Sequence, residues 1–369
     1  MHIALNLLYL IPGVVGGTET YARSLIDALA REDDDNEYSV YLSREAADLD
    51  VTPAPNFRRF VTPVVAMQRA ARYGWEQGIL PLQLMRRKPD LVHSLGYVSP
   101  LAAQCPQVVS VHDVNYLGHK GRRTAIGRRA FQFFVERSVR RADRVITISE
   151  FSRKEIVRHM NVSKDKVTVV YLAGRDNADE ANGSPESEIV QSIGRPYILA
   201  FSSLSAHKNI ARLIAAYSKI SSDVPHALVL VGHLPEKAGE RNQMQSVEND
   251  RIVFTGFIPD EEVDALMKSA SLFAFPSLYE GFGLPILDAQ HASVPVACSS
   301  ASALPEVAGD GAVQFDPHSV DDMAQALRRC LVDQDLRARL IAAGHANTSR
   351  FSWGRTARET LDVYRAVAS

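Results

Sequence analysis

The sequence has few cysteines and no long apolar run, and each absence narrows the class of protein. Its three cysteines, Cys105, Cys298 and Cys330, are too few and too scattered for a disulfide framework or a metal cluster. No uninterrupted apolar stretch is long enough to span a bilayer. The first ten residues also lack the basic start of a signal peptide. We therefore expect a cytoplasmic protein, peripheral at the inner membrane face at most.

A strong charge of either sign is also missing. The chain carries 41 Lys and Arg against 43 Asp and Glu, a net charge of −2, which argues against nucleic-acid binding. An Asp-x-Asp metal motif in a suitable loop is absent, because the acidic run at residues 33–35 follows a predicted helix and is typical of a solvated linker. We therefore expect neither a metal nor a bound cofactor.

A chain of 369 residues is longer than a single hydrophobic core usually stabilises, so we expect two domains. Short apolar runs alternate with helical patterns throughout the chain. This alternation predicts repeated strand–helix units and parallel sheets. The predicted strands are 2–8, 38–42, 91–94, 107–111, 144–148, 167–170, 197–201, 226–231, 251–254, 272–275, 294–298 and 312–315. The predicted helices are 18–30, 128–141, 150–159, 209–220, 260–269, 285–292, 320–330, 336–346 and 352–367.

The predicted fold is α/β, with two Rossmann-like domains around a cleft and ligands at the carboxyl ends of the strands. A polar stretch rich in Asp, Glu, Asn, Gly and Ser separates the two series of strands. We expect a first domain over residues 1–175, a linker over 176–195 and a second domain over 196–351. The final helix, 352–369, is expected to return to the first domain.

The most informative segment is residues 277–288, Ser-Leu-Tyr-Glu-Gly-Phe-Gly-Leu-Pro-Ile-Leu-Asp. Its glycines allow close backbone approach to a ligand, and Pro285 suits the first turn of a helix. A loop that leads into a helix N-terminus favours an anion such as phosphate. Glu280 would repel that anion unless it accepts hydrogen bonds from hydroxyl groups. A phosphate, a polyol and two carboxylates together suggest a nucleotide-sugar.

Residues 252–317 resemble the nucleotide-sugar-binding half of the family-four glycosyltransferases, which are retaining enzymes of the GT-B fold. The matching motifs are Phe-Thr-Gly-Phe at 254–257, the segment 275–285, Leu-Pro-Glu-Val at 304–307 and Phe-Asp-Pro at 315–317. Upstream, Gly-Gly-Thr-Glu at 16–19, Val-His-Asp at 111–113, Ser-Glu-Phe-Ser-Arg at 149–153 and His-Lys-Asn at 207–209 follow the family's order. The resemblance implies two Rossmann-like domains that face each other across a cleft.

The resemblance implies a role for each acid of the segment. Glu280 would contact hydroxyls of the transferred sugar, and Asp288 the ribose hydroxyls. Asp288 is one methylene shorter than the family's usual Glu, so its contact would be repositioned or bridged by water. The structural alternative is that Glu280 caps a loop and that Asp288 only interacts with the helix dipole.

Lys208 resembles the family's diphosphate-binding lysine. Many relatives have an arginine where this chain has Ser203 or His207, so Lys208 would be the permanent cation, assisted by helix N-termini and a protonated His207. Its structural alternative is a solvated surface lysine. The expected donor-binding residues are Gly17, Ser203, His207, Lys208, Phe257, Ile258, Glu280, Gly281, Phe282, Gly283, Leu284 and Asp288.

Two segments of the first half complete the expected site. Residues 16–19 follow the first strand, where Thr18 is a credible helix N-cap, or else they form a plain strand-to-helix turn. His112 ends an apolar strand and would lie near the reacting sugar, or else it is hydrogen-bonded locally. The expected acceptor-binding residues are Gly16, Gly17, Glu19 and Asp113. The expected catalytic residues are Glu280, His112 and Lys208.

Residues 119–144 carry nine Lys and Arg against two acids, interleaved with aromatic residues. Clustered basic residues near anionic lipid contribute about 1 kcal/mol each, so this segment is a candidate for membrane contact or for an anionic acceptor. The alternative is a solvated arginine-rich helix.

The functional hypothesis is a metal-independent, retaining glycosyltransferase. The residues of these motifs resemble those of mannosyltransferases of bacterial surface-polysaccharide assembly. The expected reaction therefore moves mannose from GDP-mannose to a saccharide or lipid-linked saccharide. A UDP-sugar is the second choice of donor. Two other functions stay open, a nucleotide-sugar epimerase of GT-B fold and a non-catalytic protein that only binds a nucleotide-sugar.

Overall fold

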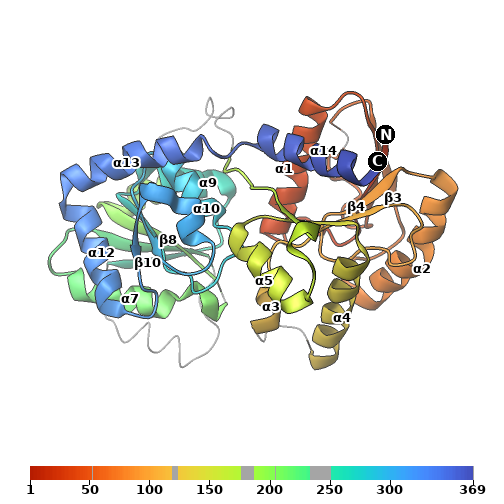
Figure 1. Ribbon diagram of the computed structural model, residues 1–369. Helices are drawn as coiled ribbons and strands as arrows, with labels where there is room; N and C mark the ends of the chain where they lie inside the picture. The colour runs from red at the N-terminus through yellow and green to blue at the C-terminus, as the bar shows by residue number, and fades with distance from the viewer. Residues whose placement is uncertain (52, 119–123, 176–186, 204, 233–250, 369) are drawn as a thin grey trace. The chain divides into compact units, whose positions relative to one another are not determined.

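The computed structural model describes residues 1–51, 53–118, 124–175, 187–203, 205–232 and 251–368 (Figure 1). The chain forms two compact units. Unit 1 comprises Met1–Leu172 and Trp353–Ser369, and unit 2 comprises Ala173–Ser352. Among the described residues, every helix is too short or too polar to cross a lipid bilayer.

Unit 1 is a parallel sheet of seven strands with helices packed against it. Its strands are β1 (His2–Leu7), β2 (Glu37–Leu42), β3 (Phe57–Val61), β4 (Leu91–Ser94), β5 (Gln107–Ser110), β6 (Arg144–Thr147) and β7 (Val167–Val169). Its helices are α1 (Gly17–Glu32), α2 (Arg69–Arg87), α3 (Asn115–Gly118), α4 (Ala125–Arg141), α5 (Glu150–Met160) and α14 (Trp353–Ala368), with the 3₁₀ turn η1 (Lys164–Lys166). The strand order is β3-β2-β1-β4-β5-β6-β7. Strands β2 and β3 are added on one side of β1, and strands β4 to β7 on its other side. The direction in which strands are added therefore reverses between β1 and β4, while all strands stay parallel.

Unit 2 is a parallel sheet of six strands in the order β10-β9-β8-β11-β12-β13. Its strands are β8 (Tyr197–Ser202), β9 (Ala227–Gly232), β10 (Ile252–Gly256), β11 (Leu272–Phe275), β12 (Val296–Ser299) and β13 (Ala312–Phe315). Its helices are α6 (Glu188–Ile193), α7 (Ile210–Ile220), α9 (Asp260–Ser269), α10 (Leu284–His291), α11 (Leu304–Ala308), α12 (Val320–Val332) and α13 (Gln334–Thr348), with 3₁₀ turns η3 (Ala206–Lys208) and η4 (Gly309–Gly311). Apolar clusters on the two faces of this sheet form its core. The order reverses between β8 and β11, where open α/β sheets bind ligands.

The predicted fold class, two Rossmann-like α/β units with the last helix returned to the first, is confirmed. Two longer elements of unit 1, β3 and α2, were not predicted from the sequence, and neither were the short helix α3 and the turn η1. β3 is an edge strand with two exposed arginines at its centre, and α2 contains two glycines and a proline, so neither has the usual pattern of its class. Of the predicted linker, 176–186 lie outside the described residues, and Glu188–Ile193 form α6.

A buried chain of hydrogen bonds fixes α14 to unit 1. The Tyr364 hydroxyl lies 2.6 Å from Nδ1 of His93, and Nε2 of that ring lies 2.8 Å from the Ser110 hydroxyl. Ser110 in turn contacts the Tyr21 hydroxyl of α1 at 2.8 Å. Burial lowers the pKa of His93 to about 3, so the ring is neutral near pH 7. In Figure 1 α14 lies beside α1, and the ion pair between Arg358 and Glu32 joins them at 2.7 Å.

Replacing Tyr364 with Phe should destabilise unit 1 by about 1–3 kcal/mol, because a buried nitrogen of His93 then lacks its partner. Urea unfolding followed by tryptophan fluorescence measures the change. The matched control is Arg365→Ala, since that exposed side chain pairs with Asp362 of the same helix, and its effect should stay below about 0.5 kcal/mol. Equal stability of Tyr364→Phe and wild type would show that the hydrogen-bond chain does not hold α14.

Candidate functional site

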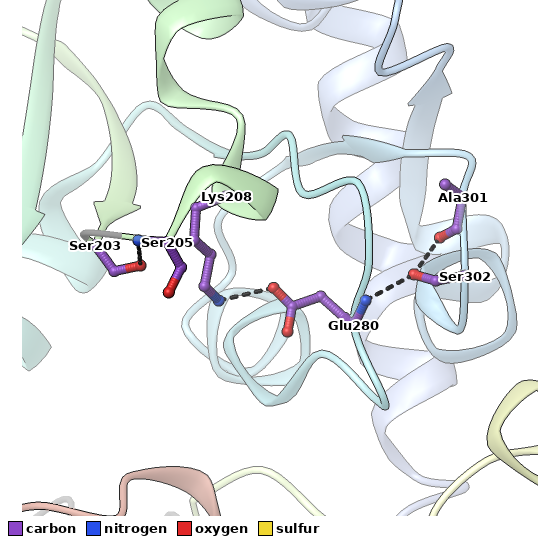
Figure 2. A network of polar contacts seen from close by, with 6 residues as sticks. All are labelled: Ser203, Ser205, Lys208, Glu280, Ala301 and Ser302. Atoms are coloured by element: carbon purple, nitrogen blue, oxygen red, sulfur yellow. Dashed lines mark hydrogen bonds and ion pairs between the residues drawn. The ribbon is translucent and has the colours of Figure 1, made fainter. Parts of the chain in front are cut away.

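An ion pair between Lys208 and Glu280 is the centre of the candidate site in unit 2. The Lys208 Nζ lies 2.7 Å from Oε1 of Glu280, and the side chains are 23% and 17% exposed (Figure 2). Lys208 follows β8 and Glu280 follows β11, so the pair stands where the strand order of this sheet reverses. The Lys208 ammonium also lies 5.2 Å from the ring centroid of Phe275, on its face. The structure therefore joins two residues that are 72 positions apart in sequence.

Backbone contacts hold the loop that carries Glu280. The Glu280 amide donates to the Ser302 hydroxyl at 3.0 Å, and that hydroxyl donates to the Ala301 carbonyl at 2.7 Å (Figure 2). The Leu278 amide donates to the His207 carbonyl at 2.7 Å, which ties the two loops together beside the ion pair. The position of the carboxylate is thus set by main-chain bonds from both sides.

Asn209 fixes the loop that carries Lys208. This buried residue has a left-handed backbone, with φ 60° and ψ 28°. Its Nδ2 donates to the carbonyls of Pro276 at 3.1 Å and Pro317 at 2.8 Å, which follow two other strands of the sheet. Sequence spacing does not predict a role for Asn209 or Ser302, because their partners lie far away in sequence.

The glycine-rich segment leads into α10 as predicted from Pro285. Gly283 precedes the helix with φ +123°, a conformation that side chains rarely adopt, and a Cβ there would lie 2.8 Å from a methyl carbon of Leu304. The φ angle is what favours glycine at this position, while the contact with the end of the Leu304 side chain adds crowding. The ring of Phe282 is buried against Phe351 at a centroid distance of 5.8 Å, so Phe282 can meet a donor only through its backbone.

Asp288 lies in α10 and contacts the chain segment that enters unit 2. The Arg175 amide donates to Oδ1 of Asp288 at 3.0 Å, and the Arg175 guanidinium pairs with Asp264 at 2.5 Å. Gly174 passes so close that a Cβ on it would lie 3.0 Å from the same carboxylate oxygen. Burial raises the pKa of Asp288 to about 6, against the opposing effect of Arg175. One carboxylate oxygen is therefore already occupied by the protein.

Four other predicted donor residues lie in loops that follow strands of unit 2. Ser203 follows β8, and its hydroxyl accepts from the Ser205 amide at 3.2 Å (Figure 2). Phe257 and Ile258 follow β10; Phe257 is 82% exposed, whereas Ile258 packs partly against the core. Gly281 is buried in the loop after Glu280. All of them stand at the carboxyl edge of the parallel sheet.

The glycine loop of unit 1 differs from the prediction in its cap. Gly16, not Thr18, occupies the N-cap position of α1, and its φ of 58° with ψ of −134° suits glycine. The Thr18 hydroxyl instead donates to the Val15 carbonyl at 2.9 Å. No described atom lies within 4 Å of a Cβ placed on Gly17, so its surface is open within unit 1. Glu19 accepts from the Gly13 amide at 2.8 Å and lies 3.3 Å from Arg23.

His112 and Asp113 follow β5 in unit 1. The His112 ring is buried and donates from Nε2 to the Leu95 carbonyl at 3.3 Å, which leaves Nδ1 without its proton. It packs edge-on against Tyr21 at a centroid distance of 4.6 Å. Burial lowers the pKa of His112 to about 4, so the ring is uncharged near neutral pH. Asp113 accepts from the Asn115 amide at 2.9 Å at the start of α3.

Metal-binding side chains do not cluster in the part of the chain that the structure describes. In the acidic run at 33–35, Asp34 and Asp35 are exposed, as a solvated linker requires, but Asp33 has a structural role, which corrects its interpretation. Asp33 is buried at the end of α1, and its carboxylate accepts from Asn36 and from the Tyr38 hydroxyl. Its oxygens are thus engaged in a turn.

Two family models match the sequence, one for each half. Residues 15–173 match Glycosyltransferase Family 4, and residues 186–346 match Glycosyl transferases group 1. O-antigen chain mannosyltransferase B of Escherichia coli is 32% identical over 230 residues, which cover 60% of this chain and 60% of that protein. Serotype-specific mannosyltransferase WbdA of the same species is 30% identical over 236 residues, 61% of this chain but 29% of that protein. The chain thus spans less than two thirds of these relatives.

Solved structures share the fold across the whole chain. Anabaena Alr3699/HepE in complex with UDP-glucose superposes with a TM-score of 0.73 at 20% identity and covers 99% of this chain and 100% of that one. At this identity the likeness establishes the architecture, with two Rossmann-like units in one chain.

Replacing Asp288 with Asn should change how stability depends on pH. Because folding raises the pKa of Asp288 from 3.8 to about 6, its ionisation costs the folded state stability as pH rises through this interval. The Asn variant keeps an oxygen for the Arg175 amide and has no charge to bury. Its melting temperature should match that of wild type near pH 4 and exceed it above pH 6, as measured by scanning calorimetry. A constant difference across this range would contradict the buried carboxylate.

Proposed function

Because the chain belongs to the family-four glycosyltransferases of the GT-B fold, we propose that it is a retaining glycosyltransferase that moves mannose from GDP-mannose to a saccharide or lipid-linked saccharide. The observation that carries the proposal is the contact between Lys208 and Glu280 at the reversal of strand order in unit 2. The names of the two E. coli relatives, both mannosyltransferases, support the choice of sugar.

The pair supplies the two kinds of group that a nucleotide-sugar needs. The Lys208 ammonium would offset the charge that develops on the departing diphosphate. The Glu280 carboxylate would accept hydrogen bonds from adjacent sugar hydroxyls. Lys208 and Glu280 pair with each other in the structure, so donor binding would replace this ion pair with contacts to the diphosphate and to the sugar. Front-face attack, with the departing phosphate as base, suits a site in which no protein nucleophile is evident among the described residues.

The remaining predicted residues are proposed to have supporting roles. Asp288 would offer its second oxygen to the ribose, and the exposed Phe257 would contact the base. In unit 1, the open glycine loop and Asp113 would receive the acceptor, while the neutral His112 would lie near the transferred sugar. Lys208 and the N-terminus of α10 would balance the phosphate charge, so we propose that transfer requires no metal.

A UDP-sugar donor is the second candidate, because the Anabaena structure with the same fold holds UDP-glucose. A nucleotide-sugar epimerase of the same fold is the third, and it would convert the donor to its epimer without an acceptor. Melting temperatures measured with different nucleotide-sugars distinguish the two donors, and the released product distinguishes a transferase from an epimerase.

GDP-mannose should raise the melting temperature of the wild-type protein more than UDP-glucose does. In Glu280→Gln, GDP alone should still raise the melting temperature as it does in wild type, since this residue is proposed to contact the sugar. The same variant should hydrolyse the donor about 10²–10³-fold more slowly. Lys208→Ala should lose the shifts caused by both GDP and GDP-mannose. Differential scanning fluorimetry and chromatography of the released nucleotide measure these effects, with and without EDTA.

Lys219→Ala is the matched control, because this lysine of unit 2 is exposed and pairs with Asp321 away from Glu280. Its donor binding should equal that of wild type. A protein whose melting temperature responds to no nucleotide would contradict the proposal. A larger shift with a UDP-sugar would reassign the donor, release of an epimer would make the protein an epimerase, and dependence on a cation would overturn metal-free transfer.

We also propose that the protein works in the cytoplasm, at the inner membrane face, through the predicted basic segment. Residues 119–123 lie outside the described residues, and most of the rest forms α4. Phe131 and Val135 of α4 are buried, while Ile126 and Phe133 are 83% and 50% exposed. Exposed apolar side chains among arginines suit the interface of an anionic membrane.

Flotation with anionic vesicles should recover the wild-type protein, and flotation with neutral vesicles should not. Reversing the charge of two exposed arginines of α4, Arg129→Glu with Arg137→Glu, should abolish recovery. Arg158→Glu on α5 changes another exposed arginine and should leave recovery intact. Absence of the wild-type protein from both kinds of vesicle would end the membrane proposal.

A further inference from the structure

A groove lies on one face of the sheet in unit 1, beside its outer strands. The parallel register pairs Ser39 with Arg58 and Tyr41 with Phe60, so these four side chains share that face. α2 covers the neighbouring strands, where its Leu80 and Leu84 join the apolar cluster. β3 is the edge strand and stays largely exposed. The face above β2 and β3 is therefore only partly covered.

Two adjacent cavities form this groove, which we call the β2–β3 groove. The larger measures about 350 Å³, and its walls include Tyr41, Phe60, Thr62, Trp75, Gln83 and Arg87. The smaller measures about 250 Å³, and its walls include His2, Glu37, Ser39 and Arg58 together with the same Phe60 and Arg87. The Arg87 guanidinium lies 3.8 Å from the centroid of the Phe60 ring, at the junction of the two cavities. The total volume suits a small ligand of one or two rings.

Three walls of the larger cavity contain polar atoms that the protein leaves unsatisfied. The Tyr41 hydroxyl, the Trp75 Nε1 and the Gln83 Oε1 are buried and have no hydrogen-bond partner among the described residues. An unsatisfied buried polar group costs about 1–3 kcal/mol, so three around one cavity are unusual. The Tyr41 hydroxyl can donate or accept a hydrogen bond, the Trp75 Nε1–H donates one, and the Gln83 Oε1 accepts one. Because a hydroxyl group can both donate and accept, a polyhydroxylated ligand can pair with all three.

The charge of the groove is positive. Arg58 and Arg87 are both exposed, and neither has an ion pair in the described part of the chain. Arg59 at the larger cavity donates to the Ala47 carbonyl at 2.8 Å. Glu37 lines the smaller cavity and offsets the charge of one of these three arginines. Planar guanidinium groups bind carboxylate and phosphate in a bidentate manner, so an anionic substituent fits here.

The aromatic rings favour a sugar over a nucleotide base. Arg87 covers one face of Phe60, and Tyr41 lies against that ring at a centroid distance of 5.5 Å and an interplanar angle of 30°. These two contacts leave little of the Phe60 ring for a base to stack on, whereas Tyr41 and Trp75 line the cavity with side chains that carry polar atoms.

We propose that the β2–β3 groove binds an acidic saccharide, a sugar whose carboxylate or phosphate is held by Arg58 and Arg87 and whose hydroxyls meet Tyr41, Trp75 and Gln83. None of these residues belongs to the predicted donor or acceptor sets. The groove is thus a separate saccharide site, and the inference does not rest on transfer activity. Such a site would hold a charged part of a glycan while another part is processed elsewhere.

The test uses isothermal titration of the full chain with mannose 6-phosphate, methyl glucuronide, mannose, inorganic phosphate and GMP. At least one acidic sugar should bind more tightly than both mannose and phosphate. The double variant Arg58→Ala with Arg87→Ala should weaken that binding at least about 10-fold. Tyr41→Phe, which keeps the ring, should weaken it by a smaller factor.

Arg86→Ala is the matched control, because Arg86 neighbours Arg87 on α2, is exposed and lies outside both cavities. It should bind like wild type, and all variants should keep the wild-type response to GDP-mannose. Four outcomes would overturn the proposal: no binding of an acidic sugar, phosphate binding as tight as that of mannose 6-phosphate, tighter binding of GMP, or an equal loss in Arg86→Ala.

Discussion

Parallel strand pairing is the constraint on which the rest of this structure depends. Every strand pair among the described residues is parallel, so within each unit the loops that follow these strands emerge at one edge. Lys208 and Glu280 meet because β8 and β11 are neighbours at the reversal of strand order, not because of any nearness in sequence. The same rule places His112 and the glycine loop at the carboxyl edge of unit 1. The candidate functional side chains lie at this edge because parallel hydrogen bonding between strands places the loops that follow the strands there.

The sequence predicted most elements because buried parallel strands have a clear apolar pattern. β3 and α2 lack such a pattern: an edge strand needs no apolar alternation, and tertiary packing overrides the helix-breaking residues of α2. For the candidate site, residue types and order were enough to select Lys208 and Glu280. They were not enough to reveal that the two form an ion pair, or that Asn209 and Ser302 hold their loops, since these contacts join segments that sequence spacing does not relate.

Asp288 shows how a shorter side chain is accommodated. Glycine at 174 allows the entering chain to pass beside the carboxylate, and the Arg175 amide occupies the oxygen that faces it. A longer acid would reach further from α10 and would meet this segment differently. The carboxylate at 288 is thus in direct contact with the segment by which the chain enters unit 2. Thr18 is a similar case on a smaller scale, because the positive φ of Gly16 displaced the expected cap.

The return of α14 to unit 1 has a consequence for the order of folding during synthesis. Tyr364 supplies the last member of a buried hydrogen-bond chain that begins in α1, yet all of unit 2 separates them in sequence. A ribosome therefore completes unit 2 before unit 1 has its final helix. Although domains usually fold from the N-terminus onwards, the first unit here must wait, with His93 and its neighbours uncovered, until the second has been made.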